Sequence, residues 1–390
     1  AGKALLRFAK KVALGPNGER WLCINGANAA GIDKVAFNER VEWVTEHHAD
    51  ILATAKDPIG NLWWAKVADG EKPWTFLAFC LEYAKLDEWK QSGQAPELFE
   101  SNLPIQVDGS CNGLQHFSAL LRDEIGGAHT NLRPASRPSD LYMRVTDPVI
   151  ELVEADAAAG DEMALAWHGK VGRKFVKRNV MTLPYGATSR GFQDQIFAEI
   201  LKKDSVDGTP YLGPDVRPQV AAQYLAKKNQ EAMGRVVVKA IQGMSWLKDV
   251  ARLVTNQNQA LTWTTPTGLR VTQKYNQEDV RKVKTYWGGI EIQYKYRKRN
   301  DKLSMPKATN SVSPNFIHSL DAAHLALTVV ACAKMGVDSF SMIHDSFGTH
   351  AGRMDTMAKV LREEFIKLYE SNPLEQWREE VASRYEVSDE

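Results

Sequence analysis

The sequence predicts an α+β fold in which helices predominate and strands are short. Apolar residues recur at helical spacing in three long stretches, residues 35–90, 170–183 and 216–258. Residues 103–107 and 341–347 are short apolar runs, and residues 290–296 alternate with a period of two, as strands do. No internal repeat interrupts this pattern.

A strand-to-helix turn is predicted at Asp108. The apolar strand 103–107 runs into this residue, and Leu114, Phe117 and Leu121 then recur at i, i+3 and i+7, which is the apolar stripe of a helix. Asp108 is therefore expected between a strand and a helix.

The second half of the chain is expected to change from helices to strands. The helices of 216–258 should break near Gly234 and Gly243, and strands should follow from Trp263, with a turn at 265–268.

The last third is expected to return to helices around one more strand. Ser313 and Pro314 predict the N-cap and first turn of a helix that ends near residue 334. Residues 341–347 are expected as one strand, with helix, strand and helix after it.

The composition is that of an ordinary globular protein, with 44% hydrophobic and 25% charged residues. The net charge is only +1, so any argument for a nucleic-acid partner must rest on local charge. The four cysteines form no CxxC pair, which disfavours a disulfide framework or a zinc site and favours a reducing cytoplasm. We expect no membrane span and no signal peptide.

Two carboxylates are candidate metal ligands. Asp108 and Asp345 are 237 positions apart, and each lies at or in a short apolar strand without a basic neighbour in sequence. A buried carboxylate needs a cationic partner, which here is Arg, Lys or a metal ion. Carboxylate oxygens suit Mg²⁺, and two such ions serve phosphoryl displacement. A turn or cap role explains Asp108 equally well, whereas Asp is disfavoured within a strand, where Asp345 is expected.

The segment GRKFVKRNVMTLPYG, residues 172–186, predicts a helix with one cationic face. Arg173, Lys177 and Tyr185 fall within roughly 120° of one another on a helical wheel, and apolar residues occupy the other face. Pro184 is expected to end or bend the helix near Tyr185. Such a face suits a triphosphate, and a plain solvated basic face is the alternative.

Residues 270–307 form a strongly basic strand region. Eleven Lys or Arg residues stand against four acidic ones, with aromatic residues between them. Cations among aromatic rings fit a nucleic-acid surface, and a solvated hairpin is the alternative. The aromatic residues are Tyr275, Tyr286, Trp287, Tyr294 and Tyr296.

His318 lies on the helix expected from Ser313, where a single histidine is more often a core or surface residue than a functional one. The sequence holds no HExxH, Walker A, GxSxG or GxGxxG motif. Zinc peptidases, P-loop NTPases, serine hydrolases and Rossmann dehydrogenases are therefore excluded.

In motif order, the sequence resembles the single-subunit DNA-directed RNA polymerases of bacteriophages and mitochondria. The segments that carry the resemblance are VDGSCNGLQHFSALLRD (107–123), RKFVKRNVMTLPYG (173–186), SPNFIHSLDAAH (313–324) and IHDSFGTH (343–350). WLCINGANAAGIDK (21–34) also resembles the start of that family's palm. The match spans nearly the whole chain.

The resemblance implies a right-hand polymerase with a palm, a small antiparallel sheet flanked by helices, and a mainly helical fingers subdomain. Residues 1–124 and 319–390 would form the palm, and residues 125–318 the fingers, including a basic hairpin at 263–300. The family's N-terminal domain and thumb are expected to be absent from this chain, so a separate segment that supplies them is a candidate partner.

The resemblance also implies a site with two Mg²⁺ ions. Asp108, the backbone carbonyl of Gly109 and Asp345 would bind the metals. Lys177 would be catalytic, as a general acid toward the pyrophosphate leaving group.

The nucleotide-binding residues implied by the resemblance come from three motifs. Arg173 and Lys177 would hold the incoming triphosphate. Tyr185 and His318 would select ribose near its 2′-hydroxyl, and His344 would lie near the primer end. The basic hairpin would occupy the place of the promoter specificity loop, with nucleic-acid-binding residues Lys274, Arg281, Lys282, Lys284, Arg297 and Lys298.

The implied function is DNA-templated RNA synthesis from NTPs, with the DNA template, its promoter and the nascent RNA as partners and no membrane. The cytoplasm of a phage-infected host is the expected location, ahead of the mitochondrion. Two alternatives stay open. A family A-like DNA polymerase would typically carry Glu shortly after the first Asp and directly after the second, where this chain has Asp-Gly-Ser-Cys-Asn-Gly and His-Asp-Ser. A non-catalytic or partner-dependent nucleic-acid-binding fragment is the other.

Overall fold

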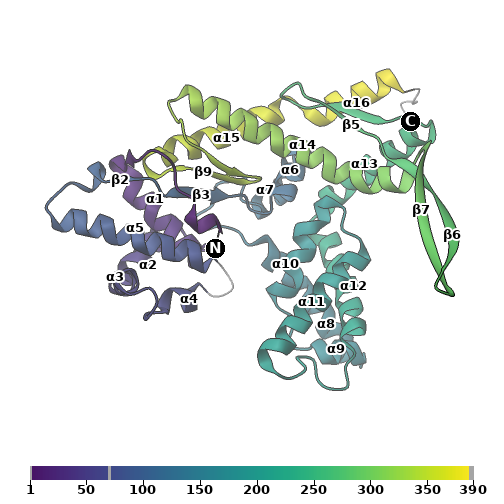
Figure 1. Ribbon diagram of the computed structural model, residues 1–390, viewed down its shortest axis with the longest axis horizontal. Coiled ribbons are helices and arrows are strands. Elements are labelled where there is room, and N and C mark those ends of the chain that lie inside the picture. Colours follow the sequence, from purple (N-terminus) through teal and green to yellow (C-terminus); the bar gives the residue numbers. More distant parts are fainter. Residues whose placement is uncertain (1, 69–71, 386–390) are drawn as a thin grey trace. The chain divides into compact units, whose positions relative to one another are not determined.

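The computed structural model describes residues 2–68 and 72–385, and the chain forms two compact units (Figure 1). The first unit comprises Ala1–Asn112, Ala128–Asp140 and Asp321–Glu370, and the second unit comprises Gly113–Gly127, Leu141–Leu320 and Ser371–Glu390. The expected helix-rich α+β class with small antiparallel sheets is confirmed. The assignment of palm and fingers to residue ranges stays a prediction.

The first unit packs helices around a small sheet. Its helices are α1 (Gly15–Ala29), α2 (Phe37–Glu46), α3 (His48–Lys56), α4 (Trp63–Val67), α5 (Pro73–Gln91) and α15 (Met354–Glu370), with 3₁₀ turns η1 (Gly2–Leu5), η2 (Pro96–Leu98) and η4 (Ala351–Arg353). Its strands are β1 (Val12–Ala13), β2 (Glu100–Ser101), β3 (Pro104–Asp108), β8 (Ser341–Ile343) and β9 (Ser346–His350). The antiparallel order β3-β9-β8 places β9 in the centre of the main sheet.

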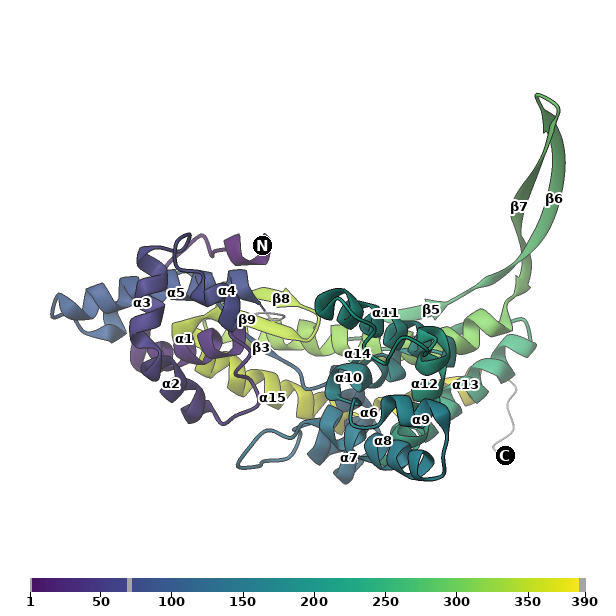
Figure 2. The ribbon, with the colours of Figure 1, turned by 90° about the horizontal axis from the view of Figure 1, so that it is seen from below.

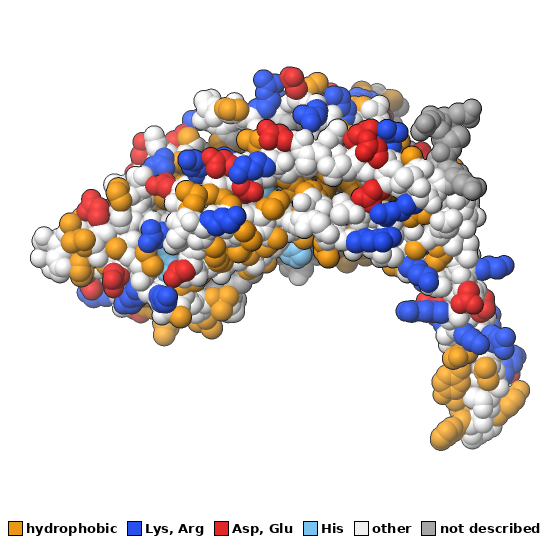
Figure 3. Space-filling model, turned by 90° about the horizontal axis from the view of Figure 1, so that it is seen from above, with side chains coloured by type: hydrophobic (Ala, Val, Ile, Leu, Met, Phe, Trp, Pro, Cys, Tyr) orange, Lys and Arg blue, Asp and Glu red, His pale blue; other side chains and the backbone are white. Residues whose placement is uncertain are grey.

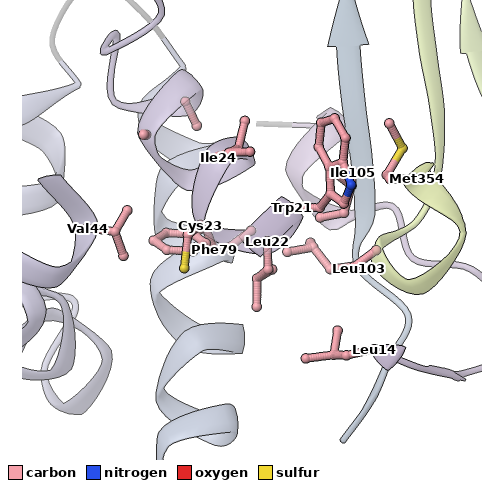
Figure 4. Packing of buried hydrophobic residues seen from close by; sticks show 14 of the residues in the cluster. Leu14, Trp21, Leu22, Cys23, Ile24, Val44, Phe79, Leu103, Ile105 and Met354 are labelled. Carbon is pink, nitrogen blue, oxygen red and sulfur yellow. The ribbon is translucent and has the colours of Figure 1, made fainter. Parts of the chain in front are cut away.

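Helix α1 forms the middle of the first unit's core (Figure 4). Leu22 and Ile24 are almost fully buried, as are Phe79 of α5 and Ile105 of β3. A Cβ at Gly26 would lie 2.5 Å from the Phe79 ring, so α1 and α5 approach more closely than a side chain at that position allows. This packing holds β3 on a rigid base.

The second unit is mainly helical. Its helices are α6 (Asn112–Leu120), α8 (Leu141–Ala158), α9 (Glu162–Trp167), α10 (Arg173–Thr182), α11 (Ser189–Asp207), α12 (Pro218–Val236), α13 (Val238–Asn256) and α16 (Pro373–Arg384), with the 3₁₀ turn η3 (Leu183–Tyr185). The short α7 (Glu124–His129) and the long α14 (Met305–Lys334) each contribute residues to both units. The strands form two antiparallel pairs, β4 (Leu261–Thr264) with β5 (Arg270–Gln273), and β6 (Asn276–Trp287) with β7 (Ile290–Leu303).

The expected break near Gly234 is confirmed, because α12 ends at Val236 and α13 begins at Val238. The break expected near Gly243 is wrong, because Gly243 lies inside α13, where a Cβ would meet the Leu121 side chain at 2.8 Å. Glycine at 243 therefore serves close packing and does not end a helix. The hairpin β6–β7 spans 276–303, later than expected, and extends away from the helices of its unit (Figure 2).

Helix α14 begins at Met305, nine residues before the expected first helical residue Pro314, so Pro314 lies inside it. The proline lacks the N–H that would bond the carbonyl of Asn310. This costs the helix one hydrogen bond, and tertiary contacts of the Ser313 region compensate, because Ser313 Oγ donates to the Pro184 carbonyl at 2.8 Å. Ser313 is therefore a packing residue and not an N-cap.

The expected single strand at 341–347 is a hairpin. β8 ends at Ile343, β9 begins at Ser346, and His344 and Asp345 form the turn, with His344 at a φ of 53°. Asp345 therefore does not lie within a strand, as the sequence predicted, and the turn that it occupies accepts Asp readily. After β9 the chain continues in α15 and α16, without the strand expected between them.

One described helix, α14, is long enough to cross a membrane and contains an 18-residue stretch that is apolar enough to do so, by length and composition alone. Its extra N-terminal turns give it a length that the sequence pattern did not predict. In the structure 44% of that 18-residue stretch is buried, and core helices of soluble proteins meet the same length and composition criterion.

Candidate active site

The two predicted metal ligands lie side by side at one end of the main sheet. Asp108 is the last residue of β3 and pairs with Ser346 of β9, and Asp345 directly precedes Ser346. The backbone N–H of Gly109 donates to the Asp345 carbonyl at 3.2 Å, which continues the ladder past the strand ends. Pairing of β3 with β9 thus brings together carboxylates that are remote in the sequence.

The electrostatics of this end of the sheet favour a bound cation. The pKa of Asp345 is raised by burial first, and then by the negative charges of Asp108 and Asp321. Lys72, which sequence reasoning missed, places Nζ 3.1 Å from Asp108 Oδ2, and both side chains are about half exposed. The Lys72 ammonium group therefore lies next to the Asp108 carboxylate, where a metal cation could also bind.

The donor set fits a magnesium ion in part. Within residues 2–68 and 72–385, no group of three or more His, Cys, Asp or Glu side chains is arranged to hold a metal. Mg²⁺ commonly uses only one or two protein carboxylates, with waters and substrate phosphates as its other ligands. The pair Asp108 and Asp345 meets that requirement.

Side-chain hydrogen bonds hold the turn that follows Asp108. Cys111 has a φ of 61°, in the left-handed region that is strained for residues other than glycine. Asn131 Nδ2 donates to Ser110 Oγ at 3.0 Å, and Asn112 Nδ2 donates to Asp321 Oδ1 at 2.9 Å. These contacts offset the strain and fix the backbone beside Asp108.

In the second unit, a buried polar network fixes helix α10. Phe175, Val176 and Val180 are buried on one face, and Asn179 lies among them. Asn229 of α12 donates to the Phe175 carbonyl at 3.1 Å and to Asn179 Oδ1 at 2.8 Å. Because Asn229 Nδ2 and both ends of the Asn179 amide are hydrogen-bonded in the core, α10 has one rotational setting, which determines where its other face points.

The cationic face of α10 lies against an aromatic ring. The Arg173 guanidinium lies 4.9 Å from the ring centroid of Tyr142 in α8, and Lys177 Nζ lies 5.8 Å from the same centroid. Cation–π contacts of this kind hold the two long side chains near one another. Sequence reasoning predicted Arg173 and Lys177 but missed Tyr142, which precedes them by more than 30 residues.

Tyr185 and His318 form a stacked pair beside a tight turn. Their ring centroids are 4.6 Å apart and their planes differ by 8°. Gly186 closes the turn after Tyr185 with a φ of 77°, and a Cβ there would lie 2.8 Å from the Asn310 carbonyl oxygen. That carbonyl is the one left without its helical donor by Pro314 in α14. The predicted helix end at Tyr185 is confirmed.

The hairpin β6–β7 has two unlike faces. Side chains alternate between faces along each strand, and cross-strand partners share a face. We call the first the basic face: Lys282, Lys284, Lys295, Arg297 and Arg299, with Glu278, Val280, Tyr286, Glu291 and Gln293. We call the second the aromatic face: Val283, Trp287, Ile290, Ile292, Tyr294 and Tyr296, with Asp279, Arg281, Thr285 and Lys298.

The predicted nucleic-acid-binding residues divide between these faces. Lys282, Lys284 and Arg297 lie on the basic face, Arg281 and Lys298 on the aromatic face, and Lys274 lies between β5 and β6. Trp287 and Ile290 at the free end of the hairpin are 76% and 70% exposed, and Figure 3 shows hydrophobic side chains gathered there with Lys and Arg closer to the base.

The predicted site residues therefore fall into two groups. Those of the first unit, Asp108, Gly109, His344 and Asp345, meet at the end of one sheet. Those of the second unit, Arg173, Lys177, Tyr185 and His318, lie on α10, η3 and α14. Asn112 and Asp321 fall inside the motifs 107–123 and 313–324, so a signal for them was present in the sequence.

Comparisons with known proteins identify the family of this chain. A family model described as DNA-dependent RNA polymerase matches residues 12–390. The chain is 37% identical to the DNA-directed RNA polymerase of Enterobacteria phage T3 and 36% identical to the T7 RNA polymerase of Escherichia phage T7, over 95% of this chain and 45% of each relative. It is 36% identical to the mitochondrial DNA-directed RNA polymerase 1 of Nicotiana sylvestris, over 96% of this chain and 36% of that relative. The chain spans less than half the length of these relatives, and it belongs to the DNA-dependent RNA polymerase family.

Proposed function

We propose that this chain carries the nucleotidyl-transfer centre of a DNA-directed RNA polymerase, which adds NTPs to an RNA 3′-hydroxyl on a DNA template. The observation that carries the proposal is the pairing of β3 with β9, which puts Asp108 beside Asp345. The longer relatives from phage T3 and from the Nicotiana sylvestris mitochondrion are named DNA-directed RNA polymerases, and this supports the same reaction here.

Asp108 and Asp345 would hold two Mg²⁺ ions, together with the Gly109 carbonyl. The bound ions would lower the pKa of the 3′-hydroxyl and stabilise the charge that develops on the phosphate oxygens. The contribution of the protein is a rigid setting of the two carboxylates, since β3 and β9 are joined by backbone hydrogen bonds and rest on the core of their unit.

The cationic face of α10 would hold the triphosphate. Arg173 and Lys177, which share the Tyr142 ring, offer charge-assisted hydrogen bonds to phosphate oxygens. In the reaction the 3′-oxygen bonds to the α-phosphorus while the bond from that phosphorus to the pyrophosphate oxygen breaks. Lys177 would give a proton to the departing pyrophosphate, and solvent would take the proton of the 3′-hydroxyl.

Sugar selection would be the role of Tyr185 and His318, whose stacked rings keep the two polar edges in a fixed relation. His344, at the turn beside Asp345, would lie near the primer end. The basic hairpin would bind promoter DNA. The host cytoplasm of a phage is the location we favour, and relatives come from phages and from plant organelles.

Primer extension tests the proposal directly. The purified chain is given an RNA primer on a DNA template, the four NTPs and Mg²⁺, and extension is measured beside Asp108→Asn and Asp345→Asn. We expect extension by the unchanged chain and a loss of about 10³-fold or more in each variant, because each removes one charge from the metal site. Asp338→Asn, which removes an exposed carboxylate of the same unit, is the matched control. Near-normal extension by either site variant would contradict the proposal.

Two other outcomes separate the alternatives. If the chain binds the primer–template but no variant or metal condition gives extension, it is a nucleic-acid-binding fragment that depends on a partner segment. If dNTPs are incorporated in preference to NTPs, it is a DNA polymerase.

A further inference from the structure

The turn after Asp108 depends on a contact that none of the proposed roles uses. Asn112 directly follows the turn of residues 108–111, and its Nδ2 donates to Oδ1 of Asp321 at 2.9 Å. Asp321 is only 5% exposed, in the long helix α14, whereas Asn112 is half-buried. A buried carboxylate that accepts from a neutral amide makes a stronger hydrogen bond than a neutral pair would make.

The strained backbone of this turn needs such a contact to hold it. Cys111 holds a left-handed backbone conformation, which is strained for a residue other than glycine. Such a conformation persists only where the surroundings determine it. Here Gly109 is held by the Asp345 carbonyl, Ser110 by Asn131, and the far end of the turn by Asp321 through Asn112.

The geometry favours an indirect role for Asp321. The described residues contain no group of three acidic, histidine or cysteine side chains arranged to hold a metal, so Asp321 does not complete a three-ligand set with Asp108 and Asp345. Its hydrogen bond instead fixes the residue where β3 has passed through the turn into α6. A change there would rotate the peptide groups at 109–111 and move the Gly109 carbonyl.

We propose that Asp321 is a positioning residue which, through Asn112, holds the turn 108–111 in the conformation that presents the Asp108 carboxylate and the Gly109 carbonyl to a divalent cation. This inference rests on the metal site of the proposed function. It adds the buried Asp321 and the half-buried Asn112, neither of which is a proposed ligand. It predicts that metal binding depends more on the hydrogen bond between them than on the charge of Asp321.

Metal binding to the purified chain provides a test that needs no catalysis. Mn²⁺, which relaxes water protons when bound, is titrated into the unchanged chain, Asp321→Ala, Asn112→Ala, Asp321→Asn and the double variant Asn112→Ala with Asp321→Ala. Removal of an outer-shell partner typically weakens a metal site about 10–100-fold. We expect the dissociation constant to rise about tenfold in each Ala variant, and to rise much less in Asp321→Asn, which keeps an acceptor oxygen.

The double variant and the control sharpen the test. Each single Ala change breaks the same hydrogen bond, between Asn112 and Asp321. The double variant should therefore bind Mn²⁺ no more weakly than whichever single Ala variant has the lower affinity. Asp338→Asn removes an exposed carboxylate from the same unit and should leave Mn²⁺ binding unchanged. Circular dichroism during heating shows which variants fold. If Asp321→Ala does not fold, Mn²⁺ binding to Asn112→Ala tests the positioning role instead.

The outcomes distinguish this inference from the proposed function. If Asp108→Asn abolishes Mn²⁺ binding while the Asn112 and Asp321 variants bind like the unchanged chain, the positioning role is wrong and the metal site stands. Independent, multiplying losses in the double variant would also overturn it. If the unchanged chain does not bind Mn²⁺, the metal site falls and this inference with it.

Discussion

Tyr185 and His318 lie ring on ring, 4.6 Å apart and nearly parallel, although 133 positions separate them in the sequence. The stack fixes both rings without using the Tyr185 hydroxyl. Tyr185→Phe should therefore keep the stack and lose one hydrogen-bonding group, which is worth about 1–1.5 kcal/mol.

For Tyr185→Phe we expect about a tenfold loss of discrimination between NTPs and dNTPs, with NTP incorporation nearly unchanged. Competition between the two in primer extension measures this ratio. Tyr211→Phe, which removes a hydroxyl that donates to the Lys170 carbonyl, is the matched control and should leave the ratio unchanged. Equal discrimination in Tyr185→Phe and the unchanged chain would remove Tyr185 from sugar selection.

Gly186 should be much less tolerant of a side chain than another left-handed glycine of the same unit. Gly186→Ala brings a Cβ within 2.8 Å of the Asn310 carbonyl oxygen, whereas the Cβ of Gly208→Ala meets no atom within 4 Å. Both changes carry the left-handed penalty of about 1–2 kcal/mol. Urea unfolding should show a larger loss for Gly186→Ala, and equal losses would mean that the carbonyl moves aside freely.

The basic face of the hairpin should determine the salt dependence of DNA binding. Lys282 and Lys295 are directly opposite each other in the register, an arrangement that destabilises an isolated hairpin. Such a pair is consistent with a polyanionic partner. Lys282→Gln with Lys295→Gln should lower the slope of log affinity against log salt by about two, at roughly 0.9 per phosphate contact.

The matched control for the hairpin is Lys359→Gln with Arg362→Gln, two exposed cations of α15. It should leave the slope unchanged. An equal drop in both double variants would show that the effect comes from net charge and not from the hairpin.

Lys72 should compete with metal for Asp108. Its ammonium group lies 3.1 Å from Oδ2, and a half-exposed pair of this kind is worth up to about 1 kcal/mol. Lys72→Met should therefore bind Mn²⁺ up to about fivefold more tightly. Weaker binding in Lys72→Met would show that Lys72 supports the metal site instead.

Alkylation should separate the cysteines by burial. Burial raises the pKa of Cys23 and of Cys80 to about 12, so almost no reactive thiolate forms at pH 8, and more forms only as the pH rises toward 12. Cys111, in the turn that follows Asp108, is partly exposed. We expect iodoacetamide to modify Cys111 first, as read by mass spectrometry, and Mn²⁺ to slow that modification. Faster labelling of Cys23 or Cys80 would contradict the burial of these thiols.

The elements that the sequence predicted well are those determined by local chemistry. Helix α10 and its end follow from residues that act on their own neighbours, because Pro184 cannot continue the helix and Gly186 accepts the left-handed conformation. The elements that it predicted wrongly depend on remote contacts. Pro314 is tolerated inside α14, where Ser313 bonds to Pro184, and no periodicity near residue 313 contains that information.

For the candidate site, the sequence alone determined which residue types are available: two carboxylates near strand ends, a cationic helix face and a basic hairpin. Only the tertiary structure decided that Asp108 lies beside Asp345, that His344 and Asp345 form a turn, and that Asp321 reaches Asn112. The physical reason is that strand register and buried hydrogen bonds join segments more than 200 residues apart. Their stability comes from packing of the whole unit, which local propensity does not encode.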